Sequence, residues 1–273
     1  MSQTLPPVDV RLMNATASMV FFSLFLLAGA AGVTWLLRNP AFAITQVVVH
    51  GSAQHSSAIS VRANVLPQLR GNLFTLDLAH ARQAFEQLPW VRHAELRRAF
   101  PNTLQVRLEE HQPVALWGDA EGSAMLNSFG EVFEANRGEV ADAQLPRLAG
   151  PAAQSQQVLA MYQFLMRQWQ SGLVPRNLAD ASQLHPSALY LTPRGNWQLF
   201  LANGAHLELG AGQPPQVGQR LSDFFETLPQ ALGPLGVRPS ALEYADLRHR
   251  NGYAIRLRGV VTEQAHTPAR ARG

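Results

Sequence analysis

The chain of 273 residues is long enough for two domains of ordinary size and one further segment. It contains no cysteine, which excludes disulfide bonds, zinc–thiolate sites and thiol nucleophiles. All 22 basic residues are arginine, so Walker-type phosphate loops and lysine Schiff bases are excluded as well. The net charge of +3 is small and scattered along the sequence, and it does not favour binding to nucleic acid.

An apolar segment near the N-terminus is the first strong feature of the sequence. No charged residue occurs from Leu12 to Leu37, and a helix of this length, rising about 1.5 Å per residue, can cross a hydrocarbon core of about 30 Å. Trp35 suits the interfacial layer of a bilayer, and Arg38 ends the apolar run. We therefore expect a short tail at residues 1–18 and a transmembrane helix at residues 19–38.

A cleaved signal peptide is the alternative for this segment, because Ala41-Phe42-Ala43 has the pattern of a cleavage site. The apolar run is longer than the ~7–15 residues of a usual signal core, and Arg38 and Pro40 interrupt the approach to that site. These features favour a retained anchor. Arg11 lies before the span and Arg38 after it, so charge does not decide the orientation. Since most of the chain follows the span, a short cytoplasmic tail is the natural expectation.

Residues 42–112 form one expected unit of β-α-α-β-β order. A Val-rich strand, Ile44–His50, comes first, and the strands Val91–Arg98 and Leu104–Glu110 form a hairpin at the end. Two helices lie between them, and their apolar residues recur at helical spacing. The residues expected to share one face are Ile59, Ala63 and Leu66 in the first helix, and Leu78, Ala81, Phe85 and Leu88 in the second.

Residues 113–261 form a second expected domain, rich in strands and with two helices, before a disordered tail at residues 262–273. One helix is expected near residues 153–172, and its apolar stripe indicates core packing. The strands are expected at 124–133 as a hairpin, at 189–192, 197–201 and 206–209, and in a last hairpin within 242–259. The apolar residues of the second helix are Val217, Leu221, Phe224, Phe225 and Leu228. The expected fold class is α+β, with a sheet covered on one face by helices.

The sequence offers no catalytic constellation. None of its nine histidines pair at metal-ligand spacing, and no H-E-x-x-H or G-x-S-x-G motif occurs. Glu109 and Glu110 are neighbours in a strand, so they point to opposite faces and cannot act as an acid–base pair. The sequence therefore predicts no enzyme, no metal site and no cofactor.

Two stretches carry a family resemblance. Gly71–Asp77 (GNLFTLD) and Leu88–Trp117 (LPWVRHAELRRAFPNTLQVRLEEHQPVALW) closely resemble the POTRA domain of the bacterial cell-division family FtsQ, also called DivIB. The Pro89-Trp90-Val91 step, the Arg97-Arg98 pair and Glu110 fall in register with that family. The resemblance extends to the anchor and to the second domain, where it implies a loop at Leu145–Pro151.

The resemblance implies a non-enzymatic, single-span protein of the inner membrane, with its N-terminus in the cytoplasm and two domains in the periplasm. In that family the protein lies at the division septum, recruits FtsB and FtsL, and links early to late division proteins. It implies no nucleic acid and no small-molecule substrate. Two other classes remain open: a POTRA-bearing transport or outer-membrane assembly component, and a periplasmic enzyme that modifies the cell wall.

The end of the second domain is the candidate partner site. From Tyr253 to Arg258 apolar and polar side chains alternate, and no further strand follows, so this strand is expected at the edge of a sheet. The arginines can discourage pairing at that edge, or a partner can add a strand there and place acidic residues against them. The family resemblance favours strand addition by FtsB. The candidate residues are Arg248, His249, Asn251, Gly252, Tyr253, Ala254, Ile255, Arg256 and Arg258.

Two residue positions in the turn of this candidate site are notable. Asn251-Gly252 is a strong signal for a tight hairpin turn, because both residues tolerate positive φ. His249 stands where a tyrosine is common in the family.

The POTRA domain carries a second candidate surface. Its residues Arg92, Arg97 and Arg98 are expected either to dock another division protein or only to keep the sheet soluble.

Overall fold

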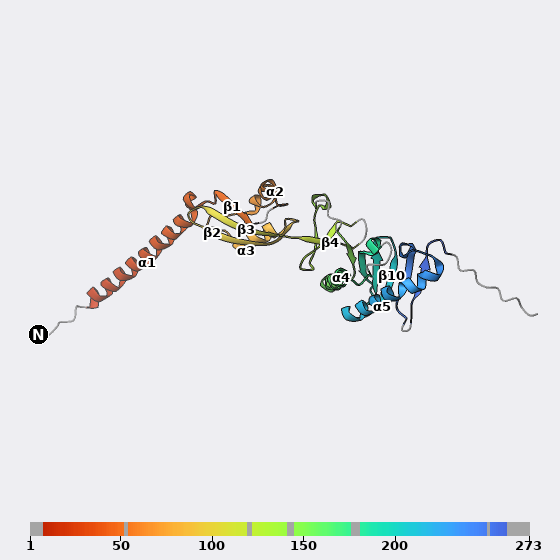
Figure 1. Cartoon of the computed structure of the whole chain (residues 1–273). Helices are drawn as coiled ribbons and strands as arrows, with labels where there is room; N and C mark the ends of the chain where they lie inside the picture. Colours follow the sequence, from red (N-terminus) through yellow and green to blue (C-terminus); the bar gives the residue numbers. More distant parts are fainter. Residues whose placement is uncertain are drawn as a thin grey trace, which may run out of the picture. The chain divides into compact units, whose positions relative to one another are not determined.

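The structure is a computed structural model that describes residues 8–51, 54–118, 122–140, 145–175, 181–249 and 252–260 (Figure 1). Its internal contacts divide the chain into two units, Met1–Glu110 and His111–Gly273. Each unit has its own hydrophobic core and is described by itself. The predicted tail at 262–273 lies outside the described residues.

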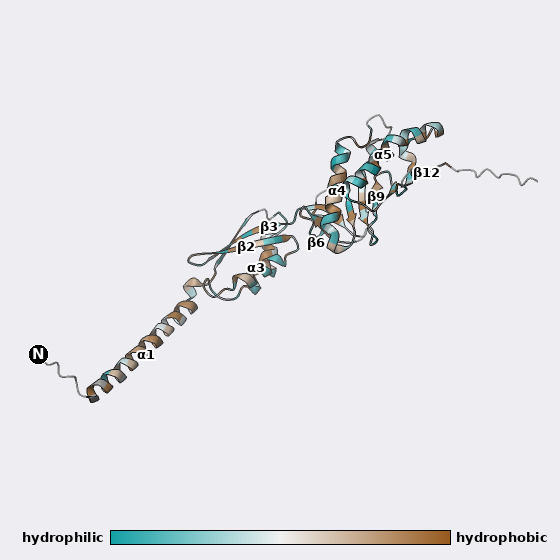
Figure 2. Ribbon diagram, turned by 90° about the horizontal axis from the view of Figure 1, so that it is seen from below, coloured by the Kyte–Doolittle hydropathy of each residue, from teal (hydrophilic) through white to brown (hydrophobic). Residues whose placement is uncertain are grey.

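The first unit begins with the long helix α1, Val8–Arg38. Its segment Leu12–Leu37 has a mean hydropathy of 2.1 and is long and apolar enough to cross a membrane, and Figure 2 shows the apolar colouring along it. The helix starts before the predicted position 19, since extending a helix that has already formed adds one hydrogen bond for each residue fixed. The hydroxyls of Thr16, Ser23 and Thr34 donate to carbonyl groups of the preceding turn, which satisfies them without water.

The POTRA part of this unit is a three-stranded sheet with two helices. The order of strands is β1-β3-β2, with β1 parallel to the central β3 and β2 antiparallel to it. The elements are β1 Gln46–Gly51, α2 Ala58–Asn64, α3 Leu78–Glu86, β2 Val91–Ala99 and β3 Thr103–Glu110. The Ser57 side chain caps α2 and the Asp77 carboxylate caps α3.

Helix α3 buries the face that its spacing predicted, with Ala81 and Phe85 fully buried against the sheet. The face predicted for the preceding helix is wrong, because Ile59 is 80% exposed. Helix α2 has only seven residues, and the buried pair consists of Val61 within it and Val65, the residue that ends it one turn later. So short a helix has room for one such pair, and its sequence did not distinguish the two faces.

Glu110 at the end of β3 has a structural role. Its carboxylate accepts backbone N–H bonds from Gln54, His55 and Ser56 at 2.9, 3.2 and 2.7 Å, and so holds the loop between β1 and α2. Burial works to raise the pKa of Glu110, but these hydrogen bonds outweigh it and hold the pKa below its ordinary value. Glu109 is exposed on the opposite face, as the strand period predicted.

The second unit contains a mixed sheet. Within the described residues it has nine strands in the order β12-β11-β10-β9-β8-β7-β4-β5-β6. The strands are β4 Pro113–Trp117, β5 Ala124–Asn127, β6 Val132–Glu134, β7 Arg147–Ala149, β8 Pro186–Leu191, β9 Trp197–Leu201, β10 His206–Gly210, β11 Leu242–Asp246 and β12 Ala254–Leu257.

Two helices, α4 Ser155–Gln170 and α5 Pro214–Leu232, cover one face of this sheet. They lie side by side, since Trp169 of α4 meets Phe225 of α5 edge-on at 5.2 Å between ring centroids. Helix α4 is shorter than predicted, because residues 152–154 form a 3-10 turn before it. The loop implied at Leu145–Pro151 contains β7, which pairs parallel with both β4 and β8. Three residues carry too little alternation to indicate a strand, so this element depends on its neighbours.

Candidate partner-binding edge

Strand β12 lies at one end of the nine-stranded sheet. It pairs antiparallel with β11, with Ala245 opposite Ile255 and Asp246 opposite Ala254. Among the residues that the structure describes, no strand pairs with its other side. The predicted edge position of this strand is therefore confirmed, and β12 presents unpaired backbone groups to a further strand.

The side chains of β12 alternate as predicted. Leu257 is buried and Ile255 is half-buried on the core side, whereas Ala254 and Arg256 are exposed. Tyr253, just before the strand, packs edge-on against Phe224 of α5 at 4.9 Å between ring centroids. Its hydroxyl lies 3.0 Å from the hydroxyl of Thr227. The core side of this strand is thus fixed by α5, and the other side remains accessible.

The two arginines of this strand differ in their contacts. The Arg256 Nε lies 3.4 Å from a Glu243 carboxylate oxygen on β11, and its guanidinium lies over the Tyr244 ring at 5.5 Å. Arg256 remains 66% exposed at its side chain, so a further anion can reach it. The Arg258 guanidinium instead donates to the backbone carbonyl of Asn203 at 2.5 Å. Arg256 is therefore the cation that this edge offers to a partner.

Arg248 has a different environment at the end of β11. Its Nε and Nη2 donate to the two oxygens of Asp246 at 2.8 and 2.6 Å, and its own N–H donates to the same carboxylate at 3.0 Å. The hydrogen bond from the Arg248 side chain is the main reason why the pKa of Asp246 falls to about 2. Asp246 itself is buried. This pair fixes the start of the chain segment that leads into β12.

Two hollows flank this segment, and His249 lines both of them. One, of about 300 Å³, also contains Asp223, Thr227, Gly252 and Tyr253 among its lining residues. The other, of about 460 Å³, lies around Arg220 and Arg248. The Arg220 guanidinium bonds to the carbonyl groups of Leu209 and Ala211 and so ties α5 to the end of β10. His249 itself is exposed.

The structure thus brings together most of the predicted residues of the edge. Arg248, His249, Gly252 and Tyr253 meet at the hollows, and Ala254 to Arg258 continue along the strand. Asn251 and the centre of the predicted turn lie outside the described residues. Sequence reasoning missed the contribution of α5, namely Arg220, Asp223 and Thr227, since only the sheet order places this helix beside the last hairpin.

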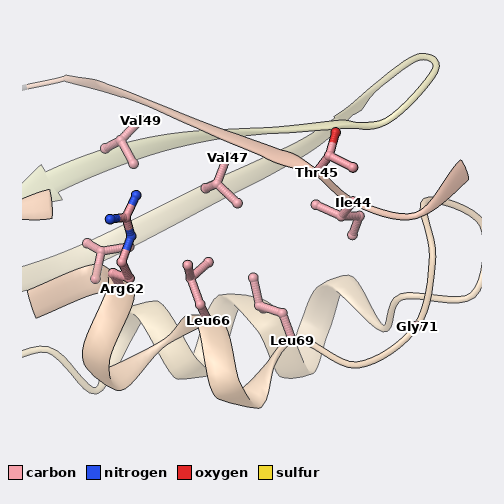
Figure 3. Close-up of a pocket in the computed structure, with 9 residues that line it drawn as sticks. Ile44, Thr45, Val47, Val49, Arg62, Leu66, Leu69 and Gly71 are labelled. Atoms are coloured by element: carbon pink, nitrogen blue, oxygen red, sulfur yellow. The ribbon is translucent and has the colours of Figure 1, made fainter. Parts of the chain in front are cut away.

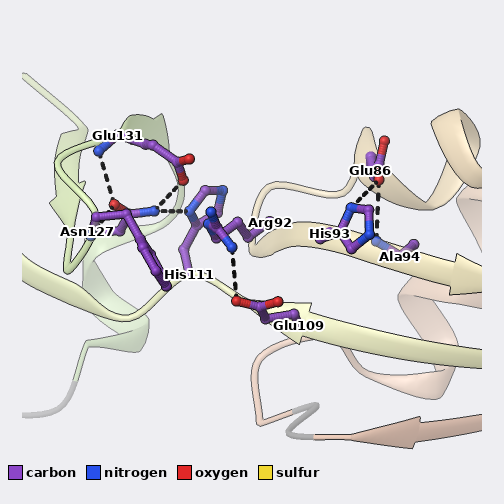
Figure 4. Close-up of polar contacts among 9 residues, drawn as sticks. Glu86, Arg92, His93, Ala94, Glu109, His111, Asn127 and Glu131 are labelled. Atoms are coloured by element: carbon purple, nitrogen blue, oxygen red, sulfur yellow. Dashed lines mark hydrogen bonds and ion pairs between the residues drawn. The ribbon is translucent and has the colours of Figure 1, made fainter.

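The predicted POTRA docking surface is arranged differently. Arg97 donates to Glu95 at 2.6 Å, and Arg92 donates to Glu109 at 2.9 Å, as Figure 4 shows for the second pair. Arg98 follows Arg97 in β2, so it points to the other face of the sheet, where it donates to the Leu76 carbonyl at 2.8 Å. The three arginines therefore do not share one face. Their role in docking stays a prediction.

A groove beside β1 is a second feature that sequence reasoning missed. It has a volume of about 350 Å³ and lies between β1 and the segment from α2 to Gly71 (Figure 3). Most of its lining residues are apolar, Val47, Val49, Leu66 and Leu69 among them, and Arg62 is the charged residue in the lining. Within the described residues β1 pairs only with β3, so the free edge of β1 borders this groove.

An apolar helix followed by two compact units fits a single-pass membrane protein, and comparison with known proteins shows that its class is that of bacterial cell-division proteins. Residues 42–111 match the model of the POTRA domain, FtsQ-type, and residues 115–248 match that of the cell division protein FtsQ/DivIB C-terminal region. The second match ends at Arg248, so most of the edge lies beyond it.

Whole-length relatives carry the identification further. The chain is 40% identical over 256 residues to the cell division protein FtsQ of Burkholderia pseudomallei, covering 92% of this chain and 94% of that protein. It is 37% identical to FtsQ of Thiomonas arsenitoxydans, covering 93% and 89%, and 35% identical to FtsQ of Bordetella pertussis, covering 94% and 95%. The chain belongs to the FtsQ/DivIB family of bacterial cell-division proteins, as its sequence motifs predicted.

Proposed function

We propose that this chain is a non-enzymatic scaffold of the divisome, anchored in the inner membrane by α1, with its N-terminus in the cytoplasm and both units in the periplasm. At the division septum it recruits FtsB and FtsL and links early to late division proteins. The family match supports this reading over a POTRA-bearing transport component or a wall-modifying enzyme. The open edge of β12 is the observation that carries the proposal.

The backbone of β12 supports the addition of a partner strand from FtsB. The N–H of Arg258 donates to the carbonyl of Ala241 at 2.8 Å, so this peptide group faces β11. Peptide groups alternate along a strand, so the N–H and C=O of Ile255 and the N–H of Leu257 point away from β11. An extended partner segment can bond to these groups and continue the sheet by one strand.

The side chains beside the edge support a partner strand that is acidic. Arg256 projects from the exposed face of β12, and its existing neighbour Glu243 is 44% exposed, so the pair is well hydrated. A carboxylate of the partner can therefore contact the Arg256 guanidinium at little desolvation cost. The hollow lined by His249, Thr227 and Tyr253 lies at the start of the strand and has room for a partner side chain. The edge therefore combines backbone pairing with a side-chain anchor.

A titration of the full-length chain in lipid nanodiscs with the FtsB of the same bacterium tests this proposal. Arg256→Glu is the sharper variant, because Arg258 also donates to Asn203 and its replacement disturbs a turn. We expect Arg256→Glu to weaken binding several-fold, with the loss reduced by added salt, because repulsion replaces attraction along the partner strand.

Arg167→Glu on α4 is the matched control, since Arg167 is exposed on a helix that packs over β7 and β8, away from β12. It changes the net charge by the same amount, and we expect it to leave the affinity unaltered. If the two variants bind equally well and both remain folded, the arginines only protect the edge and the proposal is wrong.

The anchor and the location have tests of their own. If α1 is retained, mass spectrometry of the membrane fraction should find peptides that span Arg38 to Arg62 uncut at Ala43. A mature N-terminus at Ile44 would contradict the anchor. A fluorescent fusion should concentrate at the division septum, whereas a transport component should be distributed over the cell envelope.

A further inference from the structure

Three phenylalanine rings gather at one end of the POTRA sheet, and we call them the aromatic patch: Phe42, Phe74 and Phe100. Phe42 ends the short turn that follows α1, Phe74 lies in the loop before α3, and Phe100 lies in the turn between β2 and β3. The Phe42 ring meets those of Phe74 and Phe100 at 5.0 and 5.7 Å between centroids. Even so, Phe74 is 44% exposed and Phe100 is 73% exposed. The rings touch one another without covering one another.

Covalent geometry keeps this patch close to the membrane. The apolar span ends at Leu37, and Phe42 is the fifth residue after it. A chain extends by at most about 3.5 Å per residue, so Phe42 lies within roughly 17 Å of the end of the span. Phe42 also accepts the N–H of Leu73 at 2.8 Å, and the Asn72 side chain donates to the Leu37 carbonyl. The loop that bears Phe74 is thus tied to the end of the span.

We propose that the aromatic patch is a second membrane contact of this chain, with the rings of Phe74 and Phe100 inserted in the interfacial layer of the bilayer that α1 crosses. An exposed aromatic ring has a lower free energy in the layer between headgroups and acyl chains than in water. The inference rests on the membrane span proposed above. Its consequence is that the POTRA unit meets the bilayer at two points, α1 and the patch, and cannot swing freely about the end of the helix.

A cation shortly before Phe74 in the sequence fits a lipid surface. Arg70 lies two residues before Asn72 and is exposed. In the part of the chain that the structure describes, it makes no ion pair or side-chain hydrogen bond. Arg70 precedes Phe74 by four residues, and an arginine so close along the chain to an inserted aromatic ring can bind lipid phosphate, which adds an electrostatic contribution to the apolar one. A protein groove would have to exclude water from both the rings and this cation, whereas a bilayer interface accommodates both.

The test uses the absence of cysteine in this chain, because each single cysteine can be labelled without background. Phe74→Cys and Phe100→Cys carry a fluorescent label in the full-length chain, reconstituted in nanodiscs of phosphatidylethanolamine and phosphatidylglycerol. Lipids with a quencher near the headgroup report insertion. Ile59→Cys is the matched negative control, since Ile59 is an apolar residue of the same unit and is 80% exposed. Trp35→Cys near the end of the span is the positive control.

We expect the labels at 74 and 100 to be quenched to a similar degree as the label at 35, and several-fold more than the label at 59. If the label at 35 is quenched while those at 74 and 100 behave like the label at 59, the anchor stands and the second contact is overturned. If the label at 35 is not quenched either, the span and this inference fail together. Labels that stay in water until a partner protein is added would show a protein site and overturn the lipid contact.

A second measurement needs no substitution at the patch. The unaltered chain in nanodiscs that contain a lipid with a photoreactive headgroup should crosslink at peptides that include residues 70–75 and 99–101. Crosslinks confined to α1 would overturn the proposal even if a cysteine variant had changed the local fold.

Discussion

Two sheet edges of this molecule, β12 and β1, offer the same backbone groups but different surroundings. The edge of β12 is bordered by two hollows whose lining includes the side chains of Arg220, Arg248 and His249, and its exposed face carries Arg256. The edge of β1 is bordered by a groove whose lining residues are mostly aliphatic, Val47 and Leu66 among them. Because free backbone groups attract any extended chain, the neighbouring side chains must decide which chain is bound. An acidic strand suits β12, where Arg220, Arg248, His249 and Arg256 lie close to the edge, whereas Arg62 is the charged residue that lines the groove at β1.

The largest expected effect comes from a substitution in the core of the POTRA unit, which contains β1 but not β12. Phe85 is fully buried in the POTRA unit, so Phe85→Ala should cost about 3–5 kcal/mol through lost burial and the cavity that remains. A melting curve should show the transition of the POTRA unit shifted to lower temperature. Since the second unit has its own core, FtsB binding at β12 should persist. An unshifted transition would mean that the α3 face is assigned wrongly.

A smaller effect concerns the support of β12. Asp246 is buried and accepts the Arg248 fork, so Asp246→Asn should cost about 1.5–3 kcal/mol, the usual range for hydrogen bonds to charged groups. Chemical denaturation monitored by the fluorescence of Trp197 and Trp169 in the second unit would measure this loss. Because the pair fixes the approach to β12, we also expect weaker FtsB binding. A variant with unchanged stability would show that the hydrogen bonds between Arg248 and Asp246 do not stabilise the fold.

The stability of the second unit at low pH also reports on the pair of Asp246 and Arg248, and this measurement needs no partner protein. The pKa of Asp246 falls from its ordinary value of 3.8 to about 2 in the folded chain. A depressed carboxyl pKa stabilises the fold above the unfolded value, and this stabilisation is lost as the pH falls through the folded value. The second unit should therefore lose stability between pH 4 and about pH 2, and Asp246→Asn should flatten that part of the profile. Parallel profiles for the two proteins would count against the assigned shift.

The smallest expected effect lies in the groove beside β1. Leu66→Gln makes the groove lining more polar without adding a charge, and Leu66 is only half-buried. We expect FtsB affinity to change less than twofold, in contrast with the several-fold loss for Arg256→Glu. A large loss of affinity in a folded Leu66→Gln variant would show that the comparison between the two edges is incomplete.

Sequence and structure differ most where an element depends on its neighbours. The alternation from Tyr253 to Leu257 predicted both the strand and its buried side, because one residue in two faces a core. The same reasoning assigned Ile59 to a buried face and was wrong, since α2 is too short for its periodicity to identify one face. Strand β7 has three residues and forms between two parallel partners that are distant in sequence.

The residues of the candidate site also fall into two groups, those close together in sequence and those brought together only by the fold. The residues within the last hairpin were predictable, because the hairpin is local in sequence. Arg220 and Thr227 were not, because they reach the site through a parallel pairing of β10 with β11 that α5 connects. The aromatic patch is similar: Phe42, Phe74 and Phe100 are distant in sequence and become neighbours only in the folded sheet.

The central claim is that a partner strand pairs with the outer side of β12, and hydrogen exchange at single-residue resolution tests it directly. In the full-length chain, the N–H groups of Ile255 and Leu257 should exchange quickly when free and slowly when FtsB is bound. The N–H groups of Ala254 and Arg256 face β11 and should change little. Protection of alternate residues is the signature of strand addition. Protection of all four residues to the same degree, or of none, would contradict the account.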